Sequence, residues 1–353
     1  MSITSVTRRT PSRLLAAGAG ALALGLALAG CSAGAPADES AAQSFGDVNV
    51  QLSWLKNHEF AGYYLGIEDG YFEDAGFDSV ELTAGGLGGV SAEAALASGT
   101  AWIGIASPVS VAQANLEGAD LVIVATLFQK NPFTLVSADT NPIESPEDLV
   151  GKTIAIADSS ASNWDAFLAA NDIDPADINR VPYGDANASL KLGQIDGFMG
   201  YFDGGAPLRA EGFGAQEFQL ADFGLEYSGE AVVVRRETVE NEPEKLQAFL
   251  TAFAQGWKAA FEDKDRVIDL VVNDYGKDQN YLAEDISSSW DQQATFILTE
   301  ESEANGIGTI SQRSIEANVA SIKLIGVDLD ETLFDPTFIA KVYADHPELI
   351  IGG

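Results

Sequence analysis

The chain has 353 residues, of which 53 are acidic and 19 basic, so its formal net charge is −34. This charge opposes binding to nucleic acids or to anionic lipid headgroups, because each phosphate contact needs a Lys or Arg side chain. With 46% hydrophobic and only 20% charged residues, the chain is not wholly disordered, and its length favours a well-packed protein of two lobes.

The first 30 residues have the composition of an export signal. Arg8, Arg9 and Arg13 precede an apolar run over 14–28 that consists of Leu, Ala and Gly. At about 15 residues this run is shorter than the roughly 20 that a membrane-spanning helix needs. We therefore predict a signal peptide over 1–30 that is removed, and no lasting transmembrane anchor.

Cys31 is the single cysteine of the chain, so neither an internal disulfide nor a cysteine-based metal site is expected. A lone cysteine in an exported protein can be a free thiol or an intermolecular partner, yet its place directly after the apolar run favours lipidation. The segment Leu28-Ala29-Gly30-Cys31 resembles the lipobox of bacterial lipoproteins, which implies that Cys31 is diacylated and becomes the mature N-terminus. The small, polar residues that follow are expected to form a flexible tether over 31–45.

After the tether, the chain alternates between strand patterns and helix patterns. Apolar or alternating runs predict strands at 48–52, 80–82, 102–105, 121–125, 197–200 and 231–234. Between them, helices are predicted at 60–75, 92–97, 109–116 and 163–170. Strands that are apolar on both faces are typical of a parallel sheet covered by helices, so the sequence predicts an α/β fold.

Beyond about residue 235 the sequence is mostly helical. Apolar side chains recur there at spacings of three and four in two stretches, which predicts amphipathic helices. These side chains are Leu246, Phe249, Leu250, Phe253, Trp257 and Phe261, followed by Leu282, Ile286, Trp290 and Ile297. Because Trp257 and Trp290 lie on these stripes, we predict that both pack in the core.

The sequence contains few residues suited to catalysis. His58 and His346 are its only histidines, and nothing in the sequence pairs either of them with a nucleophile. The motifs of serine hydrolases, P-loop proteins and zinc proteases do not occur, and Gly85-Gly86-Leu87-Gly88-Gly89 lacks the spacing of a dinucleotide-binding loop. We therefore predict a turn at these glycines, and a protein without enzymatic activity, cofactor or metal site.

The stretch after the first predicted strand holds the strongest candidate for a binding site. Trp54 stands at the end of that strand, and Asn57, His58 and Glu59 occupy the turn before a helix. In open α/β sheets, ligands bind at such carboxyl-end turns, where backbone donors at the helix start face the crevice. Trp54 either stacks on a flat ligand there or covers the edge of the sheet, and its position fits both interpretations.

Three segments stand out together. They are Trp54-Leu-Lys-Asn57 with the nearby Gly62-Tyr63-Tyr64 and Gly70-Tyr71-Phe72, the strand entry Ala97-Ser-Gly-Thr-Ala-Trp-Ile-Gly-Ile105, and Leu149-Val-Gly-Lys-Thr-Ile-Ala-Ile156. This set resembles the thiamine-precursor-binding branch, the NMT/THI-like family, of bacterial ABC-transporter substrate-binding proteins. The likeness extends over essentially the whole chain after the tether. It departs from the family pattern at Trp102, where the wider group has Asp, and at Leu55-Lys56, inside the more usual W-x-P-N.

The resemblance implies a type II periplasmic-binding-protein fold, in which two α/β lobes close on a ligand in a cleft between them. It places the chain crossings near residues 136 and 231. Lobe I would then comprise 46–136 and 231–353, and lobe II would comprise 137–230.

The resemblance also implies ligand-binding residues in the first lobe. Trp54 would be the stacking ring, Asn57 a hydrogen-bonding group, and Tyr63 or Tyr64 a wall of the site. Ser107, at the end of the strand Ile103-Gly-Ile-Ala-Ser107, would offer a hydroxyl.

In the second lobe, the implied ligand-binding residues are serines, an aromatic residue and acids. Ser159, Ser160 and Ser162 precede a predicted helix, where N-capping is as good an explanation as ligand contact. The remaining residues implied are Tyr201, Asp203 and Glu230. Their acids would accept hydrogen bonds from ring amino groups, although most of the 53 carboxylates must face water.

The function implied is an extracytoplasmic, lipid-anchored and monomeric protein that captures a small, flat, amino-bearing heterocycle, such as a thiamine pyrimidine precursor, and delivers it to an ABC permease. Relatives of this fold serve other ligands, so a sulfonate or nitrate oxyanion and a flavin stay as alternatives. A eukaryotic pyrimidine synthase shares the fold, but the signal peptide, the lipobox and the missing cysteine-rich iron-binding stretch argue against that activity. A tethered interaction protein without a small ligand is the remaining alternative.

Overall fold

The computed structural model describes residues 44–351 apart from 87, 203 and 329–330. The predicted signal peptide, the lipidation of Cys31, most of the tether and the predicted site residue Asp203 lie outside the described residues. Phe45, at the end of the expected tether, is half-buried: its amide donates to the Gly76 carbonyl at 2.7 Å, and its ring packs on Phe77 at 5.4 Å.

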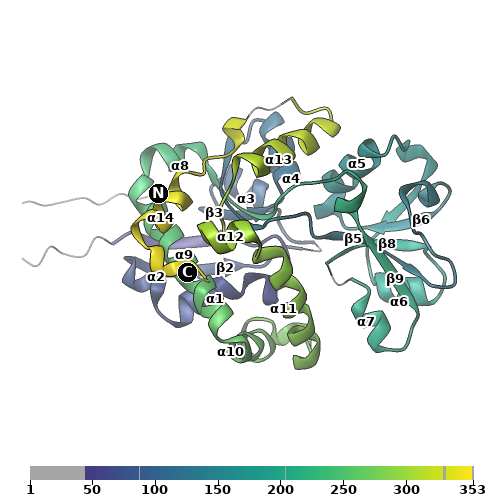
Figure 1. Ribbon diagram of the computed structural model, residues 1–353, viewed down its shortest axis with the longest axis horizontal. Helices are drawn as coiled ribbons and strands as arrows, with labels where there is room; N and C mark the ends of the chain where they lie inside the picture. The colour runs from purple at the N-terminus through teal and green to yellow at the C-terminus, as the bar shows by residue number, and fades with distance from the viewer. Residues whose placement is uncertain (1–43, 87, 203, 329–330, 352–353) are drawn as a thin grey trace, which may run out of the picture. The chain divides into compact units, whose positions relative to one another are not determined.

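Two five-stranded sheets form the framework of the described chain (Figure 1). The first sheet has the order β2-β1-β3-β10-β4. Its strands are β1 (Gly46–Gln51), β2 (Phe77–Thr83), β3 (Ile103–Ala106), β4 (Leu121–Phe128) and β10 (Gly229–Arg235). The second sheet has the order β7-β6-β8-β5-β9. Its strands are β5 (Phe133–Ala138), β6 (Thr153–Ile156), β7 (Asn179–Pro182), β8 (Gly197–Tyr201) and β9 (Ala215–Gln219).

Both sheets are mixed, so the prediction of a parallel sheet is only half correct. In the first sheet β1, β2 and β3 are parallel, but β10 runs antiparallel to both β3 and β4. In the second sheet β6, β7 and β8 are parallel, but β5 runs antiparallel to β8 and β9. The run over 121–125 is apolar on both faces, the pattern expected of a parallel strand, and the corresponding strand β4 is buried along its whole length. Burial on both faces of β4 therefore reflects the helices that cover it, and it does not determine whether the strand runs parallel or antiparallel to its neighbours.

The chain changes sheets twice. It leaves the first sheet after β4 and enters the second at β5, and it returns between β9 and β10. Residue 136, the expected outward crossing, lies inside β5, and residue 231, the expected return, lies inside β10. Each of these strands pairs with strands of one sheet only.

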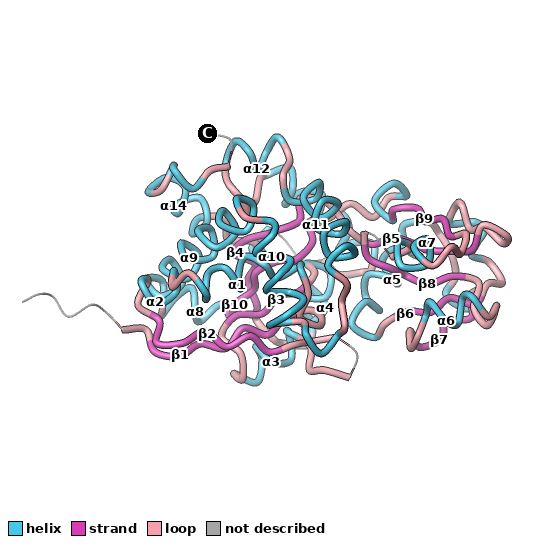
Figure 2. The backbone as a smooth tube through the Cα atoms, turned by 90° about the horizontal axis from the view of Figure 1, so that it is seen from below, coloured by secondary structure: helices cyan, strands magenta, loops and turns pink. Residues whose placement is uncertain are grey.

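Helices flank both sheets (Figure 2). Around the first third of the chain they are α1 (Ala61–Glu68), α2 (Tyr71–Asp74), α3 (Ala92–Ser98) and α4 (Pro108–Leu116). The middle of the chain contributes α5 (Ala161–Ala170), α6 (Ala186–Lys191) and α7 (Ala206–Ala210). The remainder contributes α8 (Arg236–Asn241), α9 (Pro243–Glu262), α10 (Lys264–Asp269), α11 (Ala283–Ile297), α12 (Glu300–Asn305), α13 (Gln312–Leu324) and α14 (Thr337–Asp345).

The helix predicted over 60–75 is two helices, α1 and α2. The break comes at Gly70, whose φ of +77° lies in the left-handed region that favours glycine. The hydrophobic spacing continues across this break, because Leu65 and Phe72 both face the core. Periodicity alone therefore did not reveal the interruption.

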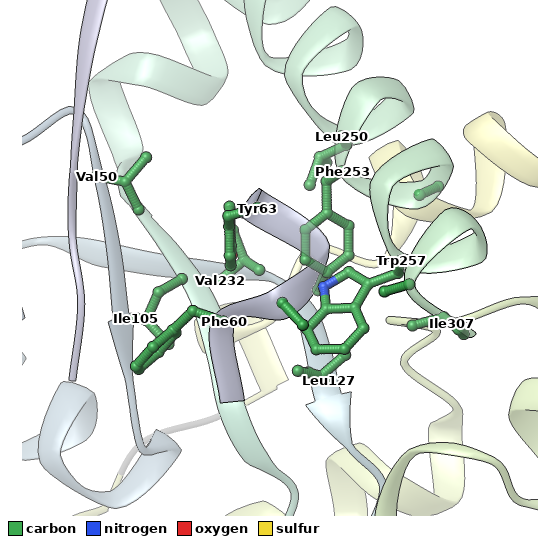
Figure 3. Close-up of a cluster of buried hydrophobic side chains, with 14 of the residues drawn as sticks. Val50, Phe60, Tyr63, Ile105, Leu127, Val232, Leu250, Phe253, Trp257 and Ile307 are labelled. Carbon is green, nitrogen blue, oxygen red and sulfur yellow. The ribbon is translucent and has the colours of Figure 1, made fainter. Parts of the chain in front are cut away.

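The largest core cluster lies between the first sheet and helices α1 and α9 (Figure 3). Trp257 of α9 is fully buried, and the close approach of α9 to α1 depends on glycines: a Cβ on Gly256 would stand 2.1 Å from the Gly62 carbonyl oxygen. Trp290 stacks on Trp257 with 6.4 Å between ring centroids. Both tryptophans are therefore core residues, as predicted. No helix within the described ranges has the length and apolar character needed to cross a membrane.

Candidate ligand-binding site

The candidate site lies at the carboxyl ends of parallel strands. The segment 52–60 follows β1, and within it Asn57 caps a short 3-10 helix, His58–Phe60, by accepting a hydrogen bond from the Glu59 amide at 2.9 Å. The first residues of the antiparallel strand β10 lie at the same edge, because Ala231 pairs with Ala106, the last residue of β3. Residues distant in sequence thus meet at one edge of the first sheet.

Glu230 is the centre of the polar contacts. Its side chain is only 7% exposed, and its φ of +48° is in the left-handed region, an uncommon conformation for a residue with a Cβ. The carboxylate accepts hydrogen bonds from the Ser53 hydroxyl at 3.0 and 3.2 Å and from the Tyr201 hydroxyl at 3.0 Å. Burial raises the pKa of Glu230 to about 7, against the opposing effect of these two hydrogen bonds.

Tyr201 makes this contact from the second sheet. It is the last residue of β8, while Ser53 follows β1 of the first sheet. One carboxylate is therefore bonded by hydroxyls from both sheets at once.

Glu59 is a second buried acid in the same place. Its carboxylate accepts a hydrogen bond from the Asn57 side-chain amide at 2.6 Å. Burial and the charge of Glu230 raise the pKa of Glu59 to about 8, and the Asn57 hydrogen bond opposes them. Among the described residues neither acid forms an ion pair, so the donors around both carboxylates are neutral hydroxyl and amide groups.

Aromatic rings border these acids. Trp54, half-buried, meets the edge of Tyr183, which directly follows β7 of the second sheet, with 6.5 Å between centroids. Its carbonyl accepts from the Gly85 amide at 2.9 Å, and a Cβ on Gly86 would stand 3.2 Å from its ring. The glycine turn thus gives the Trp54 ring room to lie against the backbone.

A second group of rings lies beside Tyr201. Phe202 packs against Tyr201 at 5.3 Å and against the ring of His58 at 5.8 Å. His58 is buried, and burial lowers its pKa to about 4, so the imidazole is neutral at physiological pH.

The two tyrosines expected as walls of the site are core residues by burial. Tyr63 packs against Phe253 at 5.5 Å and Phe249 at 6.4 Å, within the cluster of Figure 3. Tyr64 is fully buried and stacks on Tyr275 with 4.0 Å between centroids. These tyrosines belong to α1, which follows the 3-10 helix of Asn57 and Glu59 and packs their rings against α9 and Tyr275.

In the described part of the chain the expected serines bond to groups other than the two acids, although Ser107 follows Ala106 at the same edge of the first sheet as Glu230. Ser107 is the N-cap of α4 and accepts from the Ser110 amide at 3.1 Å. Ser160 precedes α5, Ser159 is exposed, and the Ser162 hydroxyl donates to Gln113 at 2.5 Å. The structure thus brings Trp54, Asn57, Tyr201 and Glu230 together and leaves these serines in capping or surface positions.

The sequence alone did not identify several residues of the site. Ser53, Glu59, Tyr183 and Phe202 were not singled out as contacts, and His58 was noted only as part of the turn. No capping-box signal marked Glu59, because it stands two residues after the N-cap Asn57, whereas that motif has its acid three residues after the cap. In the described part of the chain no group of three or more His, Cys, Asp or Glu side chains is arranged to hold a metal ion.

Comparison with known proteins gives two relatives that are each named as a binding protein for a small molecule. The chain is 24% identical over 296 residues to a formylaminopyrimidine-binding protein of Halalkalibacterium halodurans, a match that spans 79% of this chain and 83% of the relative. It is 26% identical over 263 residues to the riboflavin-binding protein RibY of Chloroflexus aurantiacus, spanning 69% of this chain and 74% of the relative.

A solved structure shares the fold. The periplasmic aliphatic sulphonate binding protein SsuA of Escherichia coli matches with a TM-score of 0.63 at 18% identity, over 82% of this chain and 92% of that protein. The two-sheet α/β architecture is therefore that of periplasmic binding proteins. The model of the family described as NMT1/THI5 like matches residues 57–267, more than half of the chain, and includes Asn57, Tyr201 and Glu230. The chain belongs to the NMT1/THI5-like family.

Proposed function

We propose that this protein is the extracytoplasmic substrate-binding component of an ABC importer, and that it captures a small planar heterocycle bearing amino groups, of the kind of a thiamine pyrimidine precursor. It hands this ligand to a membrane permease and catalyses no reaction. The two curated relatives support this role, since both are named for binding a small molecule with a planar ring system.

The observation that carries the proposal is the pair of buried acids beside Trp54. A buried carboxylate without a cationic partner needs hydrogen-bond donors, and the chain supplies only neutral ones to Glu59 and Glu230. A ligand with amino groups provides the missing donors. A flat ring also fits next to Trp54 and Tyr183, where stacking contributes about 0.5–1.5 kcal/mol beyond burial.

The same acids argue against an oxyanion ligand. A sulfonate or nitrate placed there would be repelled by the ionised form of Glu230, whose pKa of about 7 leaves it partly charged at neutral pH, and no ion pair among the described residues offsets that charge. The likeness to the sulphonate-binding protein extends to the fold at 18% identity. A flavin stays as the second candidate ligand, because the rings of Trp54, Tyr183 and Phe202 suit a larger planar system and one relative is named for riboflavin.

Capture works by closure of two lobes, one built around each sheet. A ligand shifts such an equilibrium only if it binds the closed state more tightly than the open one. The contact of Ser53 and Tyr201 through the Glu230 carboxylate supplies a point where both lobes meet the same group. An amino group bonded to Glu230 would join that contact and favour closure.

A thermal-shift screen of the purified protein tests the ligand class. Aminopyrimidines, riboflavin, an alkanesulfonate and nitrate are added in turn, and binding to the folded state alone raises the melting temperature. We expect a shift with an aminopyrimidine. A shift with riboflavin alone would select the second candidate, and a shift with the alkanesulfonate or nitrate alone would contradict the acid-based argument.

We also propose that residues 1–30 are removed, that Cys31 carries the lipid, and that the folded body is a monomer anchored at the outer face of the cell membrane. The motif around Cys31 supports this. Cys31→Ser is expected to move the protein from the membrane fraction to the soluble one, whereas Ser32→Ala should leave it in the membrane. Retention of Cys31→Ser in the membrane fraction would contradict the lipid anchor.

A further inference from the structure

Three buried side-chain atoms of His58 and Gln293 have no hydrogen-bond partner in the described part of the chain. Two are the ring nitrogens Nδ1 and Nε2 of His58, and the third is the side-chain oxygen Oε1 of Gln293. His58 is 7% exposed and Gln293 is fully buried. Buried polar atoms in folded proteins nearly always have a partner, so three such atoms in one place indicate a group that completes them.

The residues that carry these atoms, His58 and Gln293, contact each other. The Gln293 side-chain amide, from α11, donates through Nε2 to the backbone carbonyl of His58 at 3.3 Å. This bond fixes the orientation of the amide, because only the nitrogen can donate, and it leaves Oε1 as the free acceptor. The ring of His58 lies against Phe202, the neighbour of Tyr201.

The charge state of His58 sets what these atoms can recognise. Burial lowers its pKa to about 4, so the ring is uncharged at neutral pH and carries one N–H donor and one acceptor nitrogen. With the Gln293 oxygen, the place offers one donor and two acceptors and no net charge. The matching partner is a neutral group that carries a carbonyl acceptor next to N–H donors.

We propose that His58 and Gln293 form a second polar subsite of the ligand site, and that it takes a neutral amide, lactam or urea edge of the bound heterocycle. The inference rests on the proposed function, since it needs a small ligand between Trp54 and the acids. It divides recognition into two parts: Glu59 and Glu230 bind the amino group, while His58 and Gln293 bind a carbonyl with its adjoining N–H.

Two probe compounds test the subsite by calorimetry. Cytosine carries a lactam beside its amino group, and 4-aminopyrimidine carries the amino group without the lactam. We expect the wild-type protein to bind cytosine at least about tenfold more tightly, the range that one or two buried hydrogen bonds provide. His58→Phe keeps an aromatic ring against Phe202 and removes both nitrogens, so it should bring the two affinities within about twofold. Equal affinities in the wild-type protein, or a preference that survives His58→Phe, would overturn the proposal.

The matched control is the other histidine of the chain. His346 is partly exposed, its Nδ1 lies 3.2 Å from Oε1 of Glu348, and it caps the end of α14, an element separate from α11 and from the turn after β1. His346→Phe should leave both affinities as in the wild-type protein. A loss of the cytosine preference in this variant would contradict the assignment to His58.

A measurement without any ligand keeps the subsite testable by itself. If the His58 nitrogens have no partner until a ligand arrives, then replacing them by carbon should leave the melting temperature of the ligand-free protein unchanged or higher. His58→Leu serves beside His58→Phe in case the larger ring fits poorly. A lower melting temperature in both variants would show that the nitrogens bond to structural water, and would overturn the subsite. If the wild-type protein binds neither probe, the proposed ligand class fails and the melting result alone decides on the subsite.

Discussion

The two sheets follow the same strand order but carry different side chains at their carboxyl edges. Each has three parallel strands, then a strand antiparallel to both of its neighbours, and then an edge strand, but β10 joins the first sheet after the chain has crossed back whereas β5 is the first strand of the second sheet. At the edge of the first sheet lie buried polar groups, with Ser53, Asn57, Glu59 and Glu230 bonded to one another or to Tyr201. The second sheet contributes Tyr183, Tyr201 and Phe202, together with serines that cap helices or face the surface.

The difference teaches where specificity resides. A polar side chain at a helix start has a structural use, since it satisfies backbone amides that would otherwise lack partners. A buried carboxylate on a left-handed backbone, as at Glu230, destabilises the ligand-free fold, and such features gather at functional sites. In the proposed site, the first sheet would therefore supply the hydrogen-bonding specificity and the second sheet mainly the flat walls.

The largest effect is expected at Glu230. Glu230→Ala removes the buried acceptor, and a hydrogen bond to a charged group contributes about 1.5–3 kcal/mol, so ligand affinity should fall by about 100-fold in calorimetry. Asp158 is the matched control, because it is an exposed acid that follows β6 at the corresponding edge of the second sheet. Asp158→Ala should bind as the wild-type protein does. An equal loss in both variants would break the comparison between the two edges.

A smaller effect is expected at Trp54. Trp54→Ala removes the ring beside Tyr183, and with about 0.5–1.5 kcal/mol for ring stacking beyond burial the affinity should fall about tenfold. Trp54→Phe should recover most of it. Trp102→Phe is the control, since Trp102 packs among Phe77 and Phe249 and donates to Glu242. An unchanged affinity of Trp54→Ala in a titration would assign Trp54 to covering the sheet edge.

The stability of the ligand-free protein should depend on pH through the acid pair. Burial holds the pKa of Glu59 at about 8 and that of Glu230 at about 7, above the ordinary value of 4.5. Between 4.5 and these values the folded chain binds more protons than the unfolded chain, so the free energy of unfolding falls as pH rises. The pKa of His58 is lowered from 6.5 to about 4, which has the opposite effect below pH 6.5.

The two acids therefore act alone between about pH 6.5 and 8, and denaturant unfolding should show a loss of stability over this interval. The double variant Glu59→Gln with Glu230→Gln has no carboxyl groups there and should lose less stability over the same interval. A wild-type protein as stable at pH 8 as at pH 6.5 would contradict the burial of two uncompensated acids.

The smallest effect is expected at the serines. Ser107→Ala, Ser159→Ala and Ser162→Ala should each change ligand affinity by less than about twofold. Ser107→Ala should instead lower the free energy of unfolding by about 1 kcal/mol, because it removes the N-cap of α4. A tenfold loss of affinity in Ser159→Ala or Ser162→Ala would move polar recognition into the second lobe, and the same loss in Ser107→Ala would add a hydroxyl to the polar edge of the first sheet.

The sequence predicted local elements well where the pattern was local. The strands β1, β3, β4 and β8 and the helices α3, α4 and α5 fall at or within a few residues of their expected places. Strand direction could not be predicted from the local pattern. The strands β10 and β5 pair with partners far away along the chain, and a stretch such as Ala231-Val-Val-Val234 has the same apolar pattern whether it runs parallel or antiparallel. The strand β5 itself was missed.

The candidate site was predictable where a motif marked it. Trp54 and Asn57 stand in a family-like segment, and within that segment Ser53 bonds to Glu230, Trp54 contacts Tyr183 and Asn57 bonds to Glu59. Glu59 was not predictable by composition, because an acid in a turn is normally solvated in a chain with 53 acids. Its burial follows from the folding of α1 and α11 around it, which only the three-dimensional structure reveals.

The place of β10 between β3 and β4 governs the order in which the molecule can assemble during synthesis. In the described chain β4 pairs with β10 and otherwise only through a single bridge to Phe334. The backbone hydrogen-bonding groups of β4 therefore stay largely unpaired until residue 235 has been made. All strands of the second sheet, over 133–219, precede that point. Such long-range pairing is slow, because chain closure must come before the contacts that reward it. The first sheet is therefore the last part of the described chain to complete its strand pairing.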